Sequence, residues 1–203
     1  MKFTKYFSDT KRLLQFTLVV IEAHCPELFV LDVWTDCVKC TGMGATCILP
    51  DQVDAVKSIC LAYKEAVSEF IKLVVHYDIC DYHECLVNIK AEMAPIYKKL
   101  EDAGIYFSSN MYWMNTPERV ATADCFLTLG ETAQLLTIAW NKLVEAFDIS
   151  WQLDPPGYKY LGICKECGHY YVKNMSNQMF CSKPCGQAVR YRRYAAKKKA
   201  NKI

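Results

Sequence analysis

Four cysteines near the end of the chain have the spacing of a metal site. Two residues separate Cys164 from Cys167, thirteen residues follow, and the second pair is Cys181 and Cys185. Structural zinc takes four ligands in a tetrahedron, and cysteine thiolates are a common ligand set. Because a CxxC pair in a tight turn can direct both sulfurs to one centre, the spacing predicts one structural zinc ion bound by these four residues. Four free buried thiols are the alternative.

The residues around the cysteines are typical of a small folded module. Tyr170–Val172 and Gln178–Phe180 contain β-prone residues, and the polar segment Asn174–Asn177 between them is suited to a turn, so a hairpin is expected. Ser182 stands at the N-cap position of a following helix. His169, next to the first pair, is expected to donate a hydrogen bond to the thiolates rather than to bind the metal. Together these features describe a treble-clef zinc module.

The helix expected after the last cysteine has two different sides. At 100° per residue, Cys185, Val189 and Ala196 share one side, which should pack on the zinc core. Another side carries two guanidinium groups, an ammonium group and a phenol ring, from Arg190, Arg193, Tyr194 and Lys197. Such a stripe can follow phosphate groups, and a tyrosine can stack on an unpaired base. We therefore expect this face to bind DNA or RNA, with a solvated basic surface as the alternative.

The same region resembles a known family. Cys164-x-x-Cys167, then Phe180-Cys181-Ser182, Cys185-Gly186 and an Arg/Tyr-rich helix resemble the bacterial CGNR-type zinc finger, over about the last 40 residues only. The resemblance implies a zinc-dependent DNA-binding module at the end of a prokaryotic or mobile-element transcription regulator. The second cysteine pair is one residue shorter than in the family, Gln187 replaces Asn and Ala188 replaces Arg.

Charge divides the chain into an acidic and a basic part. From Tyr158 onward there are 11 Lys/Arg residues and one acid, Glu166, whereas the first 157 residues contain 13 Lys/Arg and 21 Asp/Glu. The sequence Asp-Pro-Pro-Gly at 154–157 interrupts any helix or strand. We predict an acidic helical domain over residues 1–154 and a zinc-binding module with a basic helix over residues 158–203.

Helical periodicity dominates the first part, so the fold class is predicted to be mainly α. Apolar residues recur at three- and four-residue steps from the N-cap candidate Asp51 to Val75. A second helix is expected from Tyr82 to Leu100, with a kink at Pro95 and an end at Gly104.

Further elements are expected on both sides of these two helices. One helix should begin at Thr116–Glu118 and be ended or bent by Gly130, and another apolar stripe should cover 131–147. Leu13 to Ala23 has helical spacing, although Phe16–Ile21 is rich enough in β-prone residues to form a strand instead. Leu28–Trp34 is expected to be a short strand or buried turn, and Thr35–Pro50 a loop.

Other groups of potential ligands are less regularly spaced. Cys37, Cys40 and Cys47 could form half of a second zinc site, which would have to be completed in space by His24, Cys25, His83 or Cys85. His76, Cys80 and His83 would share one face of a helix that ran through Asp78. The acids Asp78, Asp81 and Glu84 have no nucleophile, phosphate-binding glycine loop or metal-protease motif beside them, so catalysis is not indicated.

The remaining features predict a cytoplasmic protein. The basic and apolar N-terminus imitates a signal peptide but lacks its cleavage site, and no apolar run reaches the roughly 20 residues needed to span a bilayer. The predicted function is zinc-dependent nucleic-acid binding, without enzyme activity. The alternative is an interaction protein, an accessory or inhibitory subunit of a larger nucleoprotein complex, whose acidic helical body binds a protein partner.

Overall fold

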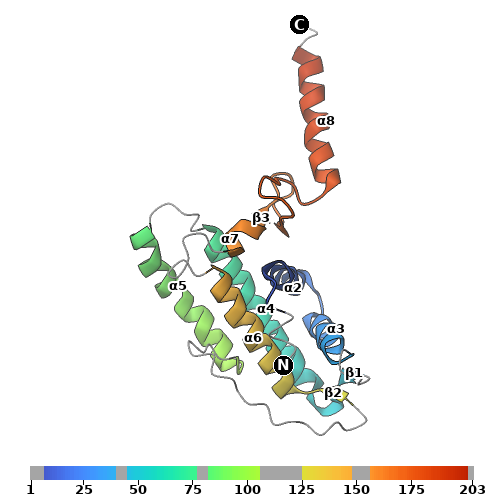
Figure 1. Ribbon diagram of the computed structural model, residues 1–203, viewed down its shortest axis with the longest axis vertical. Helices are drawn as coiled ribbons and strands as arrows, with labels where there is room; N and C mark the ends of the chain where they lie inside the picture. Colours follow the sequence, from blue (N-terminus) through green and yellow to red (C-terminus); the bar gives the residue numbers. More distant parts are fainter. Residues whose placement is uncertain (1–6, 40–44, 77–81, 106–124, 148–155, 201–203) are drawn as a thin grey trace.

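The computed structural model describes residues 7–39, 45–76, 82–105, 125–147 and 156–200, and these residues are mainly helical, as predicted (Figure 1). The α-helices are α2 (Thr10–Glu22), α3 (Pro26–Lys39), α4 (Val53–His76), α5 (Tyr82–Asp102), α6 (Leu129–Phe147), α7 (Pro156–Tyr160) and α8 (Lys183–Ala200). Strand β1 (Ala45–Ile48) pairs in parallel with β2 (Cys125–Leu127), and β3 (Leu161–Ile163) pairs antiparallel with β4 (Tyr170–Val172).

Helix α4 is the centre of the body. It contacts α2, α3, α5 and α6, and its buried side has the apolar spacing expected from the sequence. Phe70 lies edge-on to Trp140 of α6, with ring centroids 5.2 Å apart, and to Phe147, at 5.7 Å. Edge-to-face pairs of this kind add to the free energy gained by burying the rings. A 3-10 turn, Pro50–Gln52, precedes α4, so Asp51 lies in this turn and is not the N-cap of the helix.

Local signals in the sequence set several helix ends. The Asp9 side chain accepts a hydrogen bond from the Lys11 backbone N–H at the start of α2. Thr128 and Glu131 form a reciprocal capping box at the start of α6. Gly130 therefore lies in the first turn of α6 and neither ends nor bends a helix there. Gly104, with φ +82°, follows the end of α5, as predicted.

The prediction of a strand or turn at Leu28–Trp34 is wrong, because these residues form the middle of α3. Pro26 occupies the first helical position, where its missing N–H costs no hydrogen bond. Val30, Val33 and Trp34 are buried at helical spacing, so packing outweighs the β-propensity of this segment. The loop predicted for Thr35–Pro50 is likewise shortened, by the end of α3 and by β1. The helix predicted to begin at Thr116 lies outside the described residues.

The cysteine-containing part is joined to the body by α7, β3 and β4. Leu161 of β3 belongs to the same buried core as the body helices, and Tyr170 and Val172 of β4 pack against that core. The Lys11 ammonium group of α2 lies over the Tyr160 ring, 5.0 Å from its centroid. The two parts predicted from the sequence therefore share an apolar contact.

Helix α8 extends away from the body, and the C-terminus lies at its far end (Figure 1). Among the described residues, no helix is both long and apolar enough to cross a membrane.

Candidate metal centre

The four predicted cysteines meet at one point. The Sγ atoms of Cys164, Cys167, Cys181 and Cys185 all lie within 4.8 Å of one another. Two of the separations, Cys167 to Cys181 and Cys181 to Cys185, are 3.6 Å. Zinc–sulfur bonds of about 2.3 Å in a tetrahedron give sulfur–sulfur distances of about 3.8 Å. The cluster thus has the size and the donor set to hold one metal ion.

The first pair lies in a turn between β3 and β4. The backbone N–H of Cys164 donates to the His169 carbonyl at 2.9 Å, and the Gly168 N–H donates back to the Cys164 carbonyl at 2.9 Å. Gly168 has φ +74°, a left-handed conformation that glycine adopts without a steric cost. The turn thereby directs the sulfurs of Cys164 and Cys167 to the same side.

The predicted hairpin is only partly correct. β4 is a strand and the turn at Asn174–Asn177 is present, but Gln178–Phe180 is not a strand. β4 instead pairs with β3, on the other side of the CxxC turn, with Leu161 opposite Val172. The Tyr171 hydroxyl donates to the Gln178 carbonyl at 2.5 Å, and the Lys165 backbone N–H donates to the Met179 carbonyl at 3.1 Å, so the returning segment is held by single hydrogen bonds and not by a strand ladder.

The second pair lies at the start of α8, as predicted. Ser182 precedes the helix, and its hydroxyl oxygen accepts a hydrogen bond from the Cys185 backbone N–H at 3.5 Å. Cys185 is therefore in the first turn, with Cys181 just before it. Backbone N–H groups at this end of a helix favour negative charge, which suits thiolate ligands.

Burial and hydrogen bonds give the thiols of the cluster different pKa values. Burial disfavours the Cys164 thiolate, but backbone N–H groups of Cys167, Cys181 and Glu166 directed at its sulfur lower its pKa to about 6. Burial and the neighbouring thiols raise the pKa of Cys181 to about 12. The backbone N–H of His169 lowers the pKa of Cys167, but the neighbouring Cys164 and Cys185 thiols and burial outweigh it and raise that pKa. The exposed His169 side chain is not among the clustered ligands.

The stripe predicted on the final helix is exposed. Arg190, Arg193, Tyr194 and Lys197 are all open to solvent, and the Tyr194 side chain is 68% exposed. On the neighbouring side, Cys185 and Val189 are half-buried, as expected. Ala196 is exposed, so the prediction that it packs on the zinc core is wrong, because this part of α8 lies beyond the cysteine cluster.

A residue that the sequence did not single out attaches this helix to the cysteine turn. The Arg192 guanidinium group forms an ion pair with the Glu166 carboxylate. Arg192 lies on the side of α8 that carries Cys185, roughly opposite Arg190, and Glu166 lies between the first two cysteines. The basic stripe is therefore left free on the outer side.

The other groups of potential ligands are not brought together within the described residues. There, the only cluster of three or more potential metal ligands is the four-cysteine cluster. Cys25 and Cys47 are exposed free thiols. The side chains of Cys37, Cys40, His76, Cys80, His83, Cys85, Asp78, Asp81 and Glu84 lie outside the described residues.

Comparison with known proteins finds no significant match to this chain. No model of a known protein family matches the chain, and neither the curated proteins nor the solved structures include a significant match. The resemblance to the CGNR-type zinc finger therefore rests on the cysteine pairs and the basic helix alone.

Proposed function

We propose that this protein binds nucleic acid through α8 and that a structural zinc ion holds this helix in place. The observation that carries the proposal is the arrangement of α8 itself, which begins at the cysteine cluster, extends away from the body (Figure 1) and carries an exposed basic stripe. The helix contains three arginines and four lysines and no acidic residue. A cationic helix on an otherwise acidic chain favours a polyanionic partner.

The donor set supports zinc as the metal. Four thiolates complete a tetrahedron and leave no open position for a catalytic water, so the role is structural. A CxxC turn between two strands and a second pair at a helix start are the parts of a treble-clef module. Most residues of α8 are exposed, and a segment with so little core gains its stability from the metal.

The exposed side chains of the stripe would contact different parts of the nucleic acid. Arg190, Arg193 and Lys197 lie about one helical turn apart and would neutralise phosphate groups. Tyr194, beside them, would stack on an unpaired base or pack on a sugar. The regulatory role implied by the CGNR resemblance belongs to this proposal as well.

The test is binding of the zinc-loaded protein to random duplex DNA and to single-stranded RNA, measured by fluorescence anisotropy across salt concentrations. Replacing Arg190, Arg193 and Lys197 by Gln should remove about three phosphate contacts and lower the salt slope on duplex DNA by about 2.7. The matched control replaces Lys57, Lys72 and Lys98, which are exposed lysines of the body, by Gln. This control makes the same change in net charge and should keep the slope.

Equal losses in both triple variants would show that net charge alone drives binding. Zinc-loaded protein that binds neither nucleic acid would rule out the proposal. Capture of a protein partner through the acidic body would then become the better explanation of the chain.

A further inference from the structure

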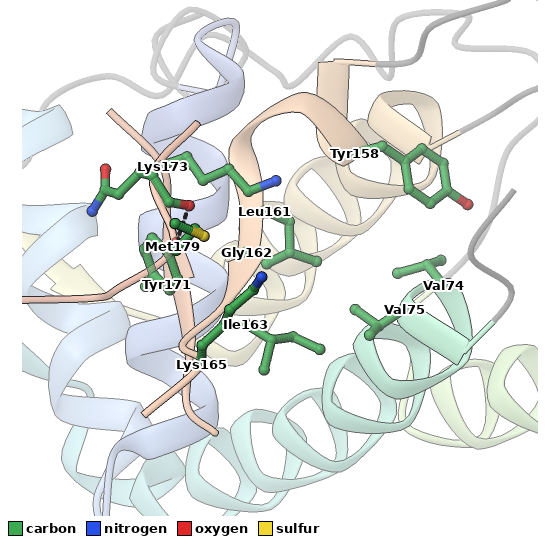
Figure 2. Close-up of a pocket in the computed structure, with 11 residues that line it drawn as sticks. Val74, Val75, Tyr158, Leu161, Gly162, Ile163, Lys165, Tyr171, Lys173 and Met179 are labelled. Carbon is green, nitrogen blue, oxygen red and sulfur yellow. Dashed lines mark hydrogen bonds between the residues drawn. The ribbon is translucent and has the colours of Figure 1, made fainter. Parts of the chain in front are cut away.

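A pocket of about 300 Å³ lies where the body meets the cysteine-containing part (Figure 2). Val74 and Val75 at the end of α4 form one wall, and Leu161 and Ile163 of β3 form another. Ile163 is 45% exposed, so this apolar wall of the pocket is open to solvent. The pocket is therefore an open site with apolar walls.

The charged groups that line this pocket in the described part of the chain have one sign. Among its described lining residues, Lys165 and Lys173 are the only charged side chains, and none is acidic. Neither lysine has an ion-pair partner in the part of the chain that the structure describes. In Figure 2 the two ammonium groups end on either side of Leu161. Two unpaired cations beside apolar walls, on a chain with an acidic body, indicate a preference for anions.

We propose that this pocket binds a small amphipathic anion, an aromatic or branched hydrocarbon that carries one carboxylate or sulfonate group. The hydrocarbon would contact Val74, Val75 and Ile163, and the acid group would accept charge-assisted hydrogen bonds from Lys165 and Lys173. A volume of about 300 Å³ is at the lower end of small-ligand pockets and suits one or two fused rings. The inference does not depend on nucleic-acid binding by α8.

Because of the position of the pocket, a bound ligand would stabilise the contact between the body and the cysteine-containing part. It would touch α4 of the body and β3 next to the cysteine turn at the same time. A ligand that binds only the folded arrangement of these two elements stabilises that arrangement by mass action. Thermal unfolding of the zinc-loaded protein should therefore shift upward as the ligand concentration rises.

The test compares three probes that share one ring system. Calorimetric titration of the zinc-loaded full chain uses 1-naphthoate, 1-naphthalenemethanol and 1-naphthylmethylammonium, which keep the ring and a one-carbon substituent while its charge changes from negative to neutral to positive. We expect 1:1 binding of naphthoate with an affinity about tenfold higher than that of the alcohol, and weaker binding of the ammonium probe. Equal affinities for the three probes would overturn the proposal.

Two variants locate the binding site. Lys165→Met with Lys173→Met keeps the apolar stems and should reduce the preference for naphthoate over the alcohol to less than about twofold. Lys57→Met with Lys98→Met makes the same change in net charge at exposed body positions and should keep it. An unchanged preference in the first pair would overturn the proposal.

The Ile163→Asp variant provides an independent check if the double lysine variant does not fold. Ile163 is nearly half exposed, so the substitution disturbs less packing than one in the core, and it places a carboxylate at the pocket. Naphthoate binding should fall about tenfold or more while the ammonium probe binds no worse. Unchanged naphthoate binding by a folded Ile163→Asp variant would contradict the assignment of the site.

Discussion

The guanidinium group of Arg192 in α8 is paired with the carboxylate of Glu166, which lies in the turn between Cys164 and Cys167. The ion pair joins the first cysteine turn to the middle of α8. It lies on the inner side of α8, so the outer side of the helix stays available. The Glu166 side chain is 17% exposed, and the Arg192 side chain is 67% exposed.

A double-mutant cycle on this pair should give a small coupling energy. Glu166→Gln, Arg192→Gln and the double variant should show a coupling of about 0.5–1 kcal/mol at low salt, because the partly exposed pair is screened by water. The coupling should fall as salt is added. Thermal unfolding of the zinc-loaded proteins measures it. Strictly additive single effects at low salt would show that the pair does not hold α8.

Loss of the metal should unfold the cysteine-containing part and leave the body folded. Cys181→Ser removes the sulfur that lies 3.6 Å from both Cys167 and Cys185, so bound zinc should fall from about one per chain to a small fraction. Amide hydrogen exchange should become faster across α8 while the buried residues of α4 stay protected.

The matched control for this variant is Cys25→Ser, at an exposed cysteine in the body. It should retain both the zinc and the protection of α8. Slow exchange across α8 in the zinc-free Cys181→Ser protein would contradict a structural role for the metal.

The cysteine cluster was predictable because the residues that signal it lie close together in the sequence. Two short spacings and the N-cap residue Ser182 fix both ligand pairs without reference to the rest of the chain. The long helices α4 and α6 were predictable for the same reason, since periodic apolar residues signal a buried face.

The features that were not predicted depend on contacts between distant segments. Periodicity alone does not reveal that β4 pairs with β3 rather than with the segment after its own turn. Leu28–Trp34 combines β-prone residues with helical spacing, and burial against α4 decides the outcome. The Glu166–Arg192 pair spans 26 residues, and no pattern in the sequence joins those two positions.

Gly157 should be essential at the junction between the body and the cysteine-containing part. A Cβ atom at this position would lie 2.6 Å from the Ala146 carbonyl oxygen and 2.7 Å from the Phe147 ring. Gly157→Ala should therefore lower the free energy of unfolding by about 1–3 kcal/mol, since α7 must shift away from α6. Urea unfolding followed by circular dichroism measures the change.

Gly130→Ala is the matched control for this substitution. Nothing lies within 4 Å of the added atom, and Gly130 is inside the first turn of α6. The control should leave stability unchanged or raise it by up to about 1 kcal/mol. Equal effects of the two substitutions would show that the close approach at Gly157 has no energetic consequence.

Cys60 should make the folded body less stable in alkali. Burial, together with the nearby Glu27 carboxylate, raises the pKa of this thiol from its ordinary value of 9.0 to about 12. Between these two values the unfolded chain releases a proton that the folded chain retains. The contribution of Cys60 to stability is thus fully present below about pH 9 and falls by about 1.4 kcal/mol per pH unit up to about pH 12.

Cys60→Ala should remove this contribution and make the alkaline decline less steep, although the cavity that it leaves costs about 1 kcal/mol at neutral pH. Urea unfolding of both proteins with a reductant and excess zinc, at several pH values between 8 and 11, measures the two slopes. Burial also raises the pKa of Tyr63, but that tyrosine is present in both proteins and cancels in the comparison. The same pH slope in both proteins would mean that the Cys60 thiol ionises as readily in the folded chain as in the unfolded one.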